Sequence, residues 1–557
     1  MNTNKVKLQI NALCEQLKVI DDPALRAVID TLFNLIELVM AENDKLRKEV
    51  QDLRDELHLL KGEQSQPNIR PQPKPGDHSS ENNRKPKGRT GNKKNRKKKK
   101  KKASIKPDRE ETCELDKNQL PDDAQFKGYD PITFQDLKIT TDNVTFNREV
   151  YYSPSLGKTF TAALPAGYWG GYGPTLKALI LDLHYNGKMT QMPIQAFLSN
   201  HGVTISKSTI SRILTQNIDE FHHEKEAVIT AGMNSTLYQQ MDDTSARVNG
   251  VNHYTHILCN PFYTAFFTRP RKDRLTILDI LMRGKLTFVF DDMTQQLMID
   301  MGLSKKQLLR LEAENPDHRL ESDAMTRLLD KLFPNPKKNK RSRQIILEAS
   351  AISAYRKHPH AVAILMTDDA PQFKLISELI ALCWIHDGRH YKKLKPVISE
   401  NKDKVDDFLA KYWDFYHSLL DYKSLASPLM AKKLEHEFDE LFATKTGYQA
   451  LDERILKSQL KKDELLLVLK YPELILHNNN SELGARVQAR YRDISLHTIT
   501  EAGTNAKDTF MTLVETAKKL TVNTYDYFLD RITKKYDVPK LSELISIKAL
   551  EAEFDSS

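Results

Sequence analysis

The sequence predicts a multidomain α+β protein, and three observations support this fold class. A heptad pattern of apolar residues near the N-terminus predicts one long helix. In the middle of the chain, short runs alternate in the way that strands do, and two strand-like runs end in a pair of acidic residues. Helical patterns separate and follow these runs. With 557 residues the chain is too long for one core, so we expect several domains.

Composition and cysteine spacing narrow the class of protein. Apolar residues make up 39% of the chain, which is ordinary for a soluble globular protein. No run of eighteen apolar residues is present, and the start "MNTNKVKLQINALCEQLK" lacks the apolar core of a signal peptide. The cysteines (Cys14, Cys113, Cys259 and Cys383) lie far apart, which argues against a zinc ribbon or a disulfide framework. We therefore expect a cytoplasmic protein with no membrane partner.

Residues 1–62 are predicted to form a helical, coiled-coil segment. Asp22-Pro23 has the order of a helix cap and a first-turn proline. After it, apolar residues recur in steps of four and three, and Asn43 occupies an a position, where a buried amide favours an in-register dimer. The helix could instead pack on its own body, but so narrow a stripe favours a parallel homodimer. The residues expected in that interface are Ile36, Asn43, Leu46, Val50 and Leu53.

Residues 63–112 are predicted to be a disordered basic linker. Between Asn82 and Pro107 there are fourteen Lys and Arg residues and no acid, so the rest of the chain carries −5 of the net +9. Such a segment attracts polyanions and releases counterions when it binds DNA. The alternative is a solubilising or targeting tail. The DNA contacts predicted here are Lys97, Lys98, Lys99 and Lys100.

Residues 113–232 are predicted to hold a small antiparallel sheet at about 133–163 and then a helix-turn-helix. Two short helices flank a turn with Gly202, and Ser206 has the position of an N-cap. Many helix pairs of this kind touch no DNA, but the neighbouring basic segment favours DNA binding. The exposed, DNA-facing residues would be Lys207, Ser208, Thr209, Ser211 and Arg212.

Three acidic residues stand where a metal-dependent core would need them. "LYQQMDDTSARV" (residues 237–248) is a strand-like run with acid at its end, and two more strand-like runs follow within residues 233–283. After an insertion at 284–358, residues 359–382 contain a second such strand, which ends at Asp368. A helical insertion at 383–470 precedes residues 471–557, where Glu482 opens a helix. The order strand, strand, helix matches a ribonuclease-H-like arrangement of acids.

Carboxylates that converge repel one another unless cations lie between them. Oxygen ligands suit Mg²⁺ or Mn²⁺, and two such ions activate an attacking oxygen and stabilise a leaving oxygen at a phosphodiester. Each acid could instead be a helix cap or a loop carboxylate. In "CWIHDGRHYKKL", Cys383, His386 and His390 share one helical face, but no fourth ligand is visible, so we do not expect zinc.

The sequence resembles the DDE transposases of the insertion-sequence-66 family from about residue 110 to 545. The blocks that carry the resemblance are "QQMDDT", "LMTDDAPQF", "CWIHDGRHYKKL", "LHNNNSELGARVQARYRDISLHT" and "AGTNAKDTFMTLVETAKKL". The family's acids fall on Asp242, Asp368 and Glu482, with Asp243 in place of the usual Glu. Strand alternation allows only one of Asp242 and Asp243 to face the metal, and we expect Asp242.

The resemblance also implies partners and further site residues. It places DNA phosphates near Arg389, Lys392 and Lys393, and near the third-acid helix. On that helix the family's usual Arg-Lys is replaced by "RYRD", so the candidate contacts are Arg486, Arg490 and Arg492. Many members carry a CxxC zinc knuckle, of which only Cys113 remains here. The insertion before Asp368 is longer than usual.

The implied function is a DNA transposase. It would bind transposon ends, hydrolyse phosphodiesters with two Mg²⁺ or Mn²⁺ ions, and join the freed 3′-hydroxyl to target DNA. Its partners would be double-stranded DNA, a second copy of the chain and accessory proteins of the same mobile element. Two alternatives stay open: a ribonuclease-H-like nuclease that cuts without joining, and a non-catalytic DNA-binding dimer derived from a transposase.

Overall fold

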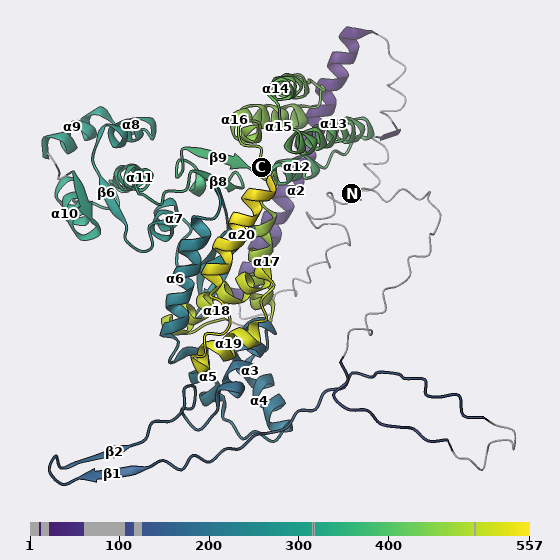
Figure 1. Ribbon diagram of the computed structural model, residues 1–557. Coiled ribbons are helices and arrows are strands. Elements are labelled where there is room, and N and C mark those ends of the chain that lie inside the picture. Colours follow the sequence, from purple (N-terminus) through teal and green to yellow (C-terminus); the bar gives the residue numbers. More distant parts are fainter. Residues whose placement is uncertain are drawn as a thin grey trace.

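The computed structural model describes residues 11–12, 22–60, 106–115, 125–314, 316, 318–494 and 497–556. Within these ranges the protein is mixed α/β, mostly helical and built around one central sheet (Figure 1). This architecture agrees with the expected multidomain α+β class. No helix in these ranges has the length and apolar character that crossing a membrane requires. Lys97, Lys98, Lys99 and Lys100 lie outside the described residues.

The central sheet has five strands in the order β5-β4-β3-β8-β9. The first three in sequence pair antiparallel, as predicted, and β8 and β9 run parallel to β3. Asn249 and Gly250 join β3 to β4 with φ of 48° and 76°, the left-handed conformation that a tight hairpin requires. The strands are β3 (Tyr238–Val248), β4 (Val251–Cys259), β5 (Thr264–Arg269), β8 (Ile364–Thr367) and β9 (Leu379–Leu382).

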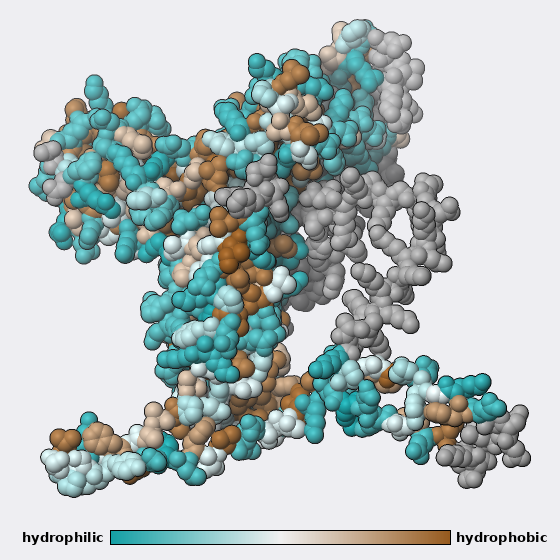
Figure 2. All heavy atoms as spheres, viewed as in Figure 1, coloured by the Kyte–Doolittle hydropathy of each residue, from teal (hydrophilic) through white to brown (hydrophobic). Residues whose placement is uncertain are grey.

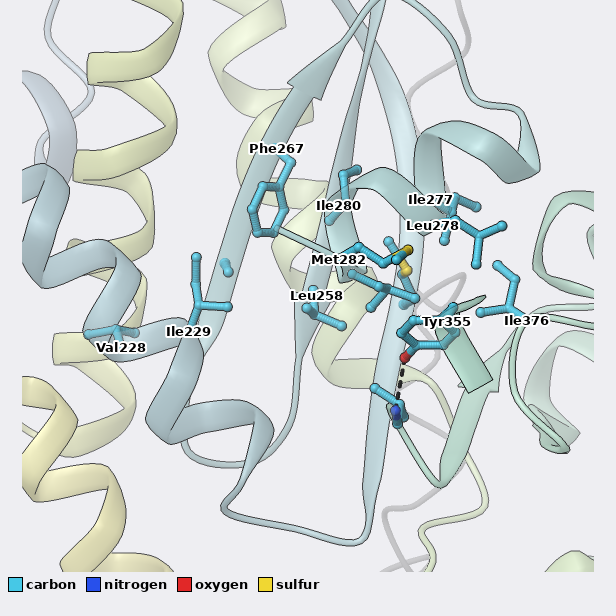
Figure 3. Close-up of a cluster of buried hydrophobic side chains, with 14 of the residues drawn as sticks. Val228, Ile229, Leu258, Phe267, Ile277, Leu278, Ile280, Met282, Tyr355 and Ile376 are labelled. Atoms are coloured by element: carbon cyan, nitrogen blue, oxygen red, sulfur yellow. Dashed lines mark hydrogen bonds between the residues drawn. The ribbon is translucent and has the colours of Figure 1, made fainter. Parts of the chain in front are cut away.

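Helices cover both faces of this sheet. Alternate strand residues point to opposite faces, so Leu258 and Phe267 pack with Ile277 and Tyr355 on one side (Figure 3). On the other side Ile257 and its neighbours pack against two helices that follow late in the chain. The helices of the first face are α6 (Asp219–Met233), α7 (Arg274–Leu281) and α11 (Lys340–Arg356), and those of the second are α17 (Asn479–Asp493) and α18 (Glu501–Leu520).

The outward-facing N–H groups of the edge strand β5 have hydrogen-bond partners. Three side chains of α18 accept hydrogen bonds from its N–H groups, since Thr516, Thr512 and Asp508 lie 3.2, 3.1 and 2.6 Å from the amides of Thr264, Phe266 and Thr268. A covered edge cannot pair with another chain. Any strand-mediated contact with a partner would therefore have to use another part of the molecule.

Two insertions interrupt the sheet, and both are mostly helical, as predicted. The first separates α7 from β8 and contains one short antiparallel pair. The second follows β9 and has its own core around Trp384, Tyr412 and Phe438. The first contains β6 (Thr287–Val289), α8 (Asp292–Asp300), α9 (Lys305–Glu314), β7 (Arg319–Glu321), α10 (Ser322–Leu332) and α11. The second contains α12 (Trp384–Lys392), α13 (Ser399–Ser424), α14 (Pro428–Phe442), α15 (Gln449–Gln459), α16 (Lys462–Leu465) and η5 (Leu467–Leu469).

The predicted helix-turn-helix is formed by α4 (Gln191–Asn200) and α5 (Lys207–Thr215). Gly202 takes φ of 82° in the turn, and the Ser206 hydroxyl accepts a hydrogen bond from the Thr209 amide at 3.2 Å, which confirms Ser206 as N-cap. The pair lies beside the chain's C-terminal helices (Figure 1). The pair contacts α3 (Pro174–Leu181), η3 (Asp182–Asn186) and α18, while α19 (Thr524–Thr533) packs on α3 and α20 (Leu541–Ser556) packs on α6.

The predicted sheet at 133–163 is much smaller in the structure. Only β1 (Val150–Ser153) and β2 (Lys158–Thr161) pair, as an exposed hairpin on an arm that extends from the body (Figure 1). Residues 125–149 form neither helix nor strand before the start of β1. The alternation that predicted a longer sheet is real, but an exposed arm has no apolar layer against which further strands could pack.

The long N-terminal helix α2 (Pro23–Leu60) combines features of both alternatives raised above. Its first half packs on the body, where Ile29 and Phe33 contact Ile398, and the Glu37 carboxylate accepts hydrogen bonds from the amides of Val397 and Ile398 at 2.7 and 2.9 Å. The predicted interface residues Leu46, Val50 and Leu53 are exposed. Ile36 packs against the body, which corrects its placement in a dimer interface.

Candidate active site

Asp242 lies within the central strand β3, directly after four buried residues, Tyr238 to Met241. Its register partner on β4 is Ile257. Cross-strand partners share one face of a sheet, and Ile257 packs against α17 and α18, so Asp242 faces those helices. The strand thus delivers one carboxylate toward α17.

Asp368 follows the last residue of β8. Because β8 is parallel to β3 and Met366 is level with Gln240, the chain carries Asp368 to the level of Asp242. The amide of Ala370 donates a hydrogen bond to Oδ1 of Asp368 at 3.1 Å, which fixes the carboxylate at the strand end before η4 (Pro371–Phe373) begins. Parallel pairing therefore brings together two acids that are far apart in sequence.

Glu482 stands in the first turn of α17. The helix approaches the sheet closely because its next turn contains Gly484: a Cβ there would lie 2.8 Å from Cγ2 of Ile257, closer than side chains pack. Glycine at this position therefore allows the short distance between α17 and β4. Because Glu482 lies just before it on the same helix, its distance from the sheet depends on this glycine as well.

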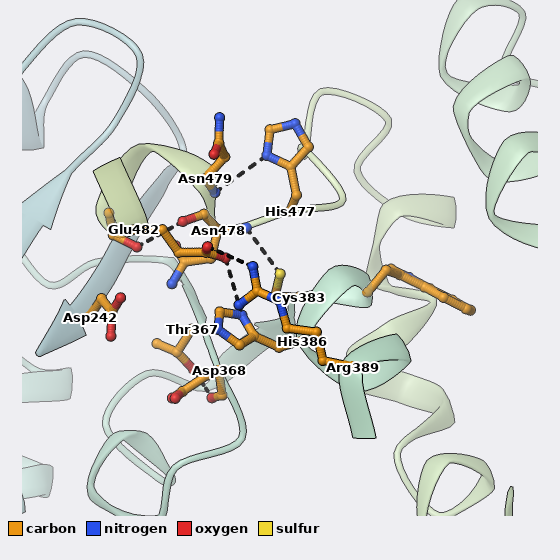
Figure 4. Close-up of polar contacts among 12 residues, drawn as sticks. Asp242, Thr367, Asp368, Cys383, His386, Arg389, His477, Asn478, Asn479 and Glu482 are labelled. Carbon is orange, nitrogen blue, oxygen red and sulfur yellow. Dashed lines mark hydrogen bonds and ion pairs between the residues drawn. The ribbon is translucent and has the colours of Figure 1, made fainter. Parts of the chain in front are cut away.

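The three carboxylates face one space (Figure 4), but among the described residues they do not form a group whose ligand atoms all lie within 4.8 Å of one another. Burial, together with repulsion from Asp368 and more weakly from Asp243 and Glu482, raises the pKa of Asp242 to about 7. Burial also raises the pKa of Asp368. The fold therefore holds Asp242 and Asp368 where burial disfavours negative charge.

Two side chains from α12 reach Glu482. The Arg389 guanidinium lies 2.9 Å from Oε2, and Nδ1 of His386 lies 3.6 Å from Oε1. Both side chains project from one face of α12 toward the acids (Figure 4). Burial lowers the pKa of His386, so at neutral pH the positive charge beside Glu482 comes mainly from Arg389.

Asp243 points away from this group, as expected from strand alternation. The side-chain Nε2 of Gln372 donates a hydrogen bond to Oδ2 of Asp243 at 2.8 Å. Nζ of Lys272 lies 3.6 Å from Oδ1 of Asp243. Since Gln372 belongs to the segment after Asp368, Asp243 joins β3 to the loop that carries the second acid. Asp242, and not Asp243, therefore faces α17.

Cys383, His386 and Glu482 form the one group of three potential metal ligands found among the described residues, with ligand atoms within 4.8 Å of one another. The Cys383 sulfur accepts a hydrogen bond from the Asn478 amide at 3.1 Å, and burial raises the pKa of this thiol to about 12. His390 does not belong to the group.

Asn478 is a site residue whose role the sequence did not reveal. It is fully buried, its Nδ2 donates to the carbonyl of Met241 at 2.9 Å, and its Oδ1 accepts from Nε2 of Gln240 at 3.1 Å. Asn478 therefore ties the start of α17 to the residue before Asp242 and, through its amide, to Cys383. The signal in the sequence was "HNNNSE", where an Asn-rich turn precedes the acid.

The predicted DNA contacts in the described ranges lie on three surfaces. Lys207 and Ser208 are exposed at the start of α5, with Thr209 half-buried beside them, and Arg212 is exposed in its last turn. Lys392 and Lys393 are exposed at the end of α12. On α17, Arg490 is exposed, Arg486 is half-buried, and Nη1 of Arg492 donates to the carbonyl of Ser245 at 3.0 Å.

Comparison with known proteins finds a relative whose name states no activity. The chain is 27% identical over 328 residues to a protein of Sinorhizobium fredii named "Uncharacterized protein y4jO". That match covers 58% of this chain and 100% of the relative. No family model matches the chain.

Proposed function

We propose that this protein is a DDE transposase, an enzyme that binds transposon ends and cuts and joins DNA strands. The observation that carries the proposal is the convergence of Asp242, Asp368 and Glu482 from β3, β8 and α17 (Figure 4). Nothing in the fold alone requires three acids in one place, and their proximity destabilises the metal-free protein.

The strand order supports a ribonuclease-H-like core. Three antiparallel strands, β3, β4 and β5, are followed by two strands parallel to β3. The acids stand on the first of these strands, just after the fourth, and on a helix against one face. This is the placement that the resemblance to insertion-sequence-66 transposases implies.

The donor set fits hard divalent cations. All three side chains offer only oxygen, and burial disfavours the ionised forms of Asp242 and Asp368, so a neighbouring cation would favour them. The residues that would hold Mg²⁺ or Mn²⁺ are Asp242, Asp368 and Glu482. When bound, two such ions supply activation of an attacking oxygen and stabilisation of a leaving oxygen at a phosphodiester.

The chain's own residues prepare this site. Asn478 and Gly484 fix Glu482 against β3 and β4, and Asp243 holds the Asp368 loop through Gln372. Arg389 neutralises Glu482 in the metal-free protein, so it must give up that contact when a cation takes it over. The released guanidinium would then be free to bind a DNA phosphate. Arg389 would thus pair with Glu482 in the metal-free protein and with DNA in the loaded one.

Other parts of the molecule support a role on DNA. The exposed residues Lys207 and Ser208 open the second helix of the helix-turn-helix, the usual position for contact with bases and phosphates, and the exposed Arg212 follows in its last turn. The exposed stripe at Leu46, Val50 and Leu53 suits a second copy of the chain, and a dimer would pair two transposon ends. We place the protein in the bacterial cytoplasm, associated with the nucleoid when bound to DNA.

The test is cleavage of labelled transposon-end duplexes by Asp242→Asn, Asp368→Asn and Glu482→Gln. Each variant should lose Mg²⁺-dependent nicking by several orders of magnitude and bind DNA within about threefold of wild type, because only the reacting centre changes. Asp369→Asn, next to the second acid, is the matched control and should nick normally. Normal nicking by Glu482→Gln would remove the third acid from the proposal.

Pre-nicked ends distinguish the alternatives. A transposase should join their 3′-hydroxyls to target DNA, whereas a nuclease that only cuts should not. A non-catalytic DNA-binding dimer should show neither reaction, and its DNA binding should not change with any of the three substitutions.

A further inference from the structure

The first insertion presents an exposed basic surface at and before the start of α11. We define the α11 basic patch as Lys337, Lys338, Lys340 and Arg341, which are all exposed. Within the part of the chain that the structure describes, none of the four forms an ion pair. Figure 2 shows the surface of this insertion as mainly hydrophilic.

The patch is placed where positive charge is unfavourable without a partner. Lys340 and Arg341 lie in the first turn of the 17-residue helix α11, which has no acid in that turn. The N-terminal end of a helix carries partial positive charge, so cations there reduce stability. Arg343, two residues after Arg341, forms an ion pair with Asp330 at 2.7 Å. The four patch residues have no such partner among the described residues, so an external anion could bind them.

The loop that bears the patch has a defined conformation. Oδ1 of Asn335 accepts a hydrogen bond from the Lys338 amide at 3.0 Å, and its carbonyl accepts one from the Asn339 amide at 2.9 Å. The backbone that carries these side chains is therefore fixed before any ligand arrives, which lowers the entropy lost on binding.

The patch continues toward the acids through the connection between β5 and α7. Arg271 and Lys340 line one hollow of about 190 Å³, beside Arg343. The hollow's two acids are engaged elsewhere, because Asp273 caps α7 by accepting from the Thr276 amide at 2.9 Å and Glu348 pairs with Arg274.

Lys272, the next residue, is exposed and lies 3.6 Å from Asp243. The positive surface therefore extends from the insertion to the residue beside Asp242.

Arg274 connects the helix that carries this surface to the segment that follows Asp368. Nη2 of Arg274 donates to the carbonyl of Pro371 at 3.0 Å and Nε to the carbonyl of Lys374 at 2.8 Å, while Nη1 pairs with Glu348 on α11. The segment after Asp368 and the helix that begins with the patch are thus fixed to the same side chain.

We propose that the α11 basic patch, with Arg271 and Lys272, forms a phosphate-binding surface that holds the DNA duplex running away from the acidic centre. The inference rests on the proposed function for the identity of the ligand, and it assigns a role to the insertion at 284–358. A row of fixed cations that begins beside Asp243 matches a polyanion with regularly spaced charges.

The test compares two variants of the full chain that lose the same charge. The patch variant is K337Q/K338Q/K340Q/R341Q, and the control variant K432Q/K445Q/K457Q/K470Q removes four exposed lysines of the second insertion. Binding to a transposon-end duplex is measured between about 50 and 200 mM salt. The patch variant should bind at least about tenfold more weakly at the lower salt, and the slope of log K against log salt should fall by about 0.9 for each lost phosphate contact.

The outcomes separate this inference from the function on which it rests. If wild type and control bind and nick DNA and the patch variant has their affinity and slope, the surface is not a DNA site, while the proposed function stands. If the patch variant loses affinity but wild type never nicks, the surface stands and the catalytic proposal fails. If wild type binds no DNA, both fail.

Folding is checked by thermal denaturation of both variants. If the patch variant is unfolded, Lys338→Gln and Arg341→Gln are measured singly, and each should lower the slope by about 0.9. Unchanged slopes in two folded single variants would overturn the inference.

Discussion

The Arg389 guanidinium lies 2.9 Å from Oε2 of Glu482, so a cation of the chain itself stands beside the third acid. This contact stabilises the metal-free arrangement and competes with a metal for the same oxygen. A charge-assisted hydrogen bond of a half-exposed arginine contributes about 1 kcal/mol.

Arg389→Gln should therefore lower the melting temperature of the metal-free protein and enlarge the rise that saturating Mg²⁺ produces. The expected reason is that Glu482 loses its internal partner and gains more from the ion. The measurement is a thermal shift with and without Mg²⁺, with Lys393→Gln, exposed at the end of the same helix, as control. An equal Mg²⁺ response in both variants would show that Arg389 does not compete with the ion.

Stability of the metal-free protein should fall as pH rises from about 4 to about 7. Burial and repulsion raise the pKa of Asp242 to about 7, so in this range the folded state holds a proton that the unfolded state has released. Raising the pH then favours the unfolded state. The raised pKa of Asp368 acts in the same direction.

Thermal denaturation across that range should show the loss in wild type and a smaller loss in Asp242→Asn. Asp403→Asn, which removes an exposed carboxylate on α13, should behave as wild type. Saturating Mg²⁺ should reduce the dependence in wild type, because a cation favours the ionised acids. Identical profiles for wild type and Asp242→Asn would contradict the assigned environment of this residue.

Asn478→Ala should destabilise the protein by about 2 to 4 kcal/mol, since it removes the side-chain donor to the Met241 carbonyl and one of the acceptors of Gln240 Nε2, which also donates to the His477 carbonyl. Asn479→Ala is the matched control in the same turn, because no hydrogen bond of its side chain holds the sheet. Denaturant unfolding gives the stability difference. Equal stability of the two variants would mean that Asn478 does not fasten α17 to β3.

Leu46→Ala/Val50→Ala/Leu53→Ala should convert a dimer to a monomer without changing the fold of the body, because all three side chains are exposed in the single chain. Light scattering after gel filtration measures the mass. Glu42→Ala/Glu49→Ala, on the same half of α2, should leave the mass unchanged. A triple variant with the mass of wild type would exclude this stripe as the dimer interface.

Much of the local structure could be predicted from the sequence, because it depends on neighbours along the chain. Ser206 caps its helix and Asn249-Gly250 makes a hairpin through backbone groups a few residues away. The period of apolar residues in α2 predicted a helix. It did not predict that the Glu37 carboxylate would accept hydrogen bonds from the amides of Val397 and Ile398, which lie far away in the sequence. The short hairpin β1–β2 shows the converse: alternation alone does not build a sheet without a layer to cover it.

By itself the sequence determined that acids follow two buried strand segments and open one helix, because periodicity and turn residues act over short distances. The expectation that Asp242 ends its strand was wrong, since β3 continues to Val248. Only the tertiary structure decided that Asp242 rather than Asp243 faces α17, that Arg389 reaches Glu482, and that Asn478 joins three elements. These relationships depend on strand register and on the close approach allowed by Gly484, which arise only when distant segments pack.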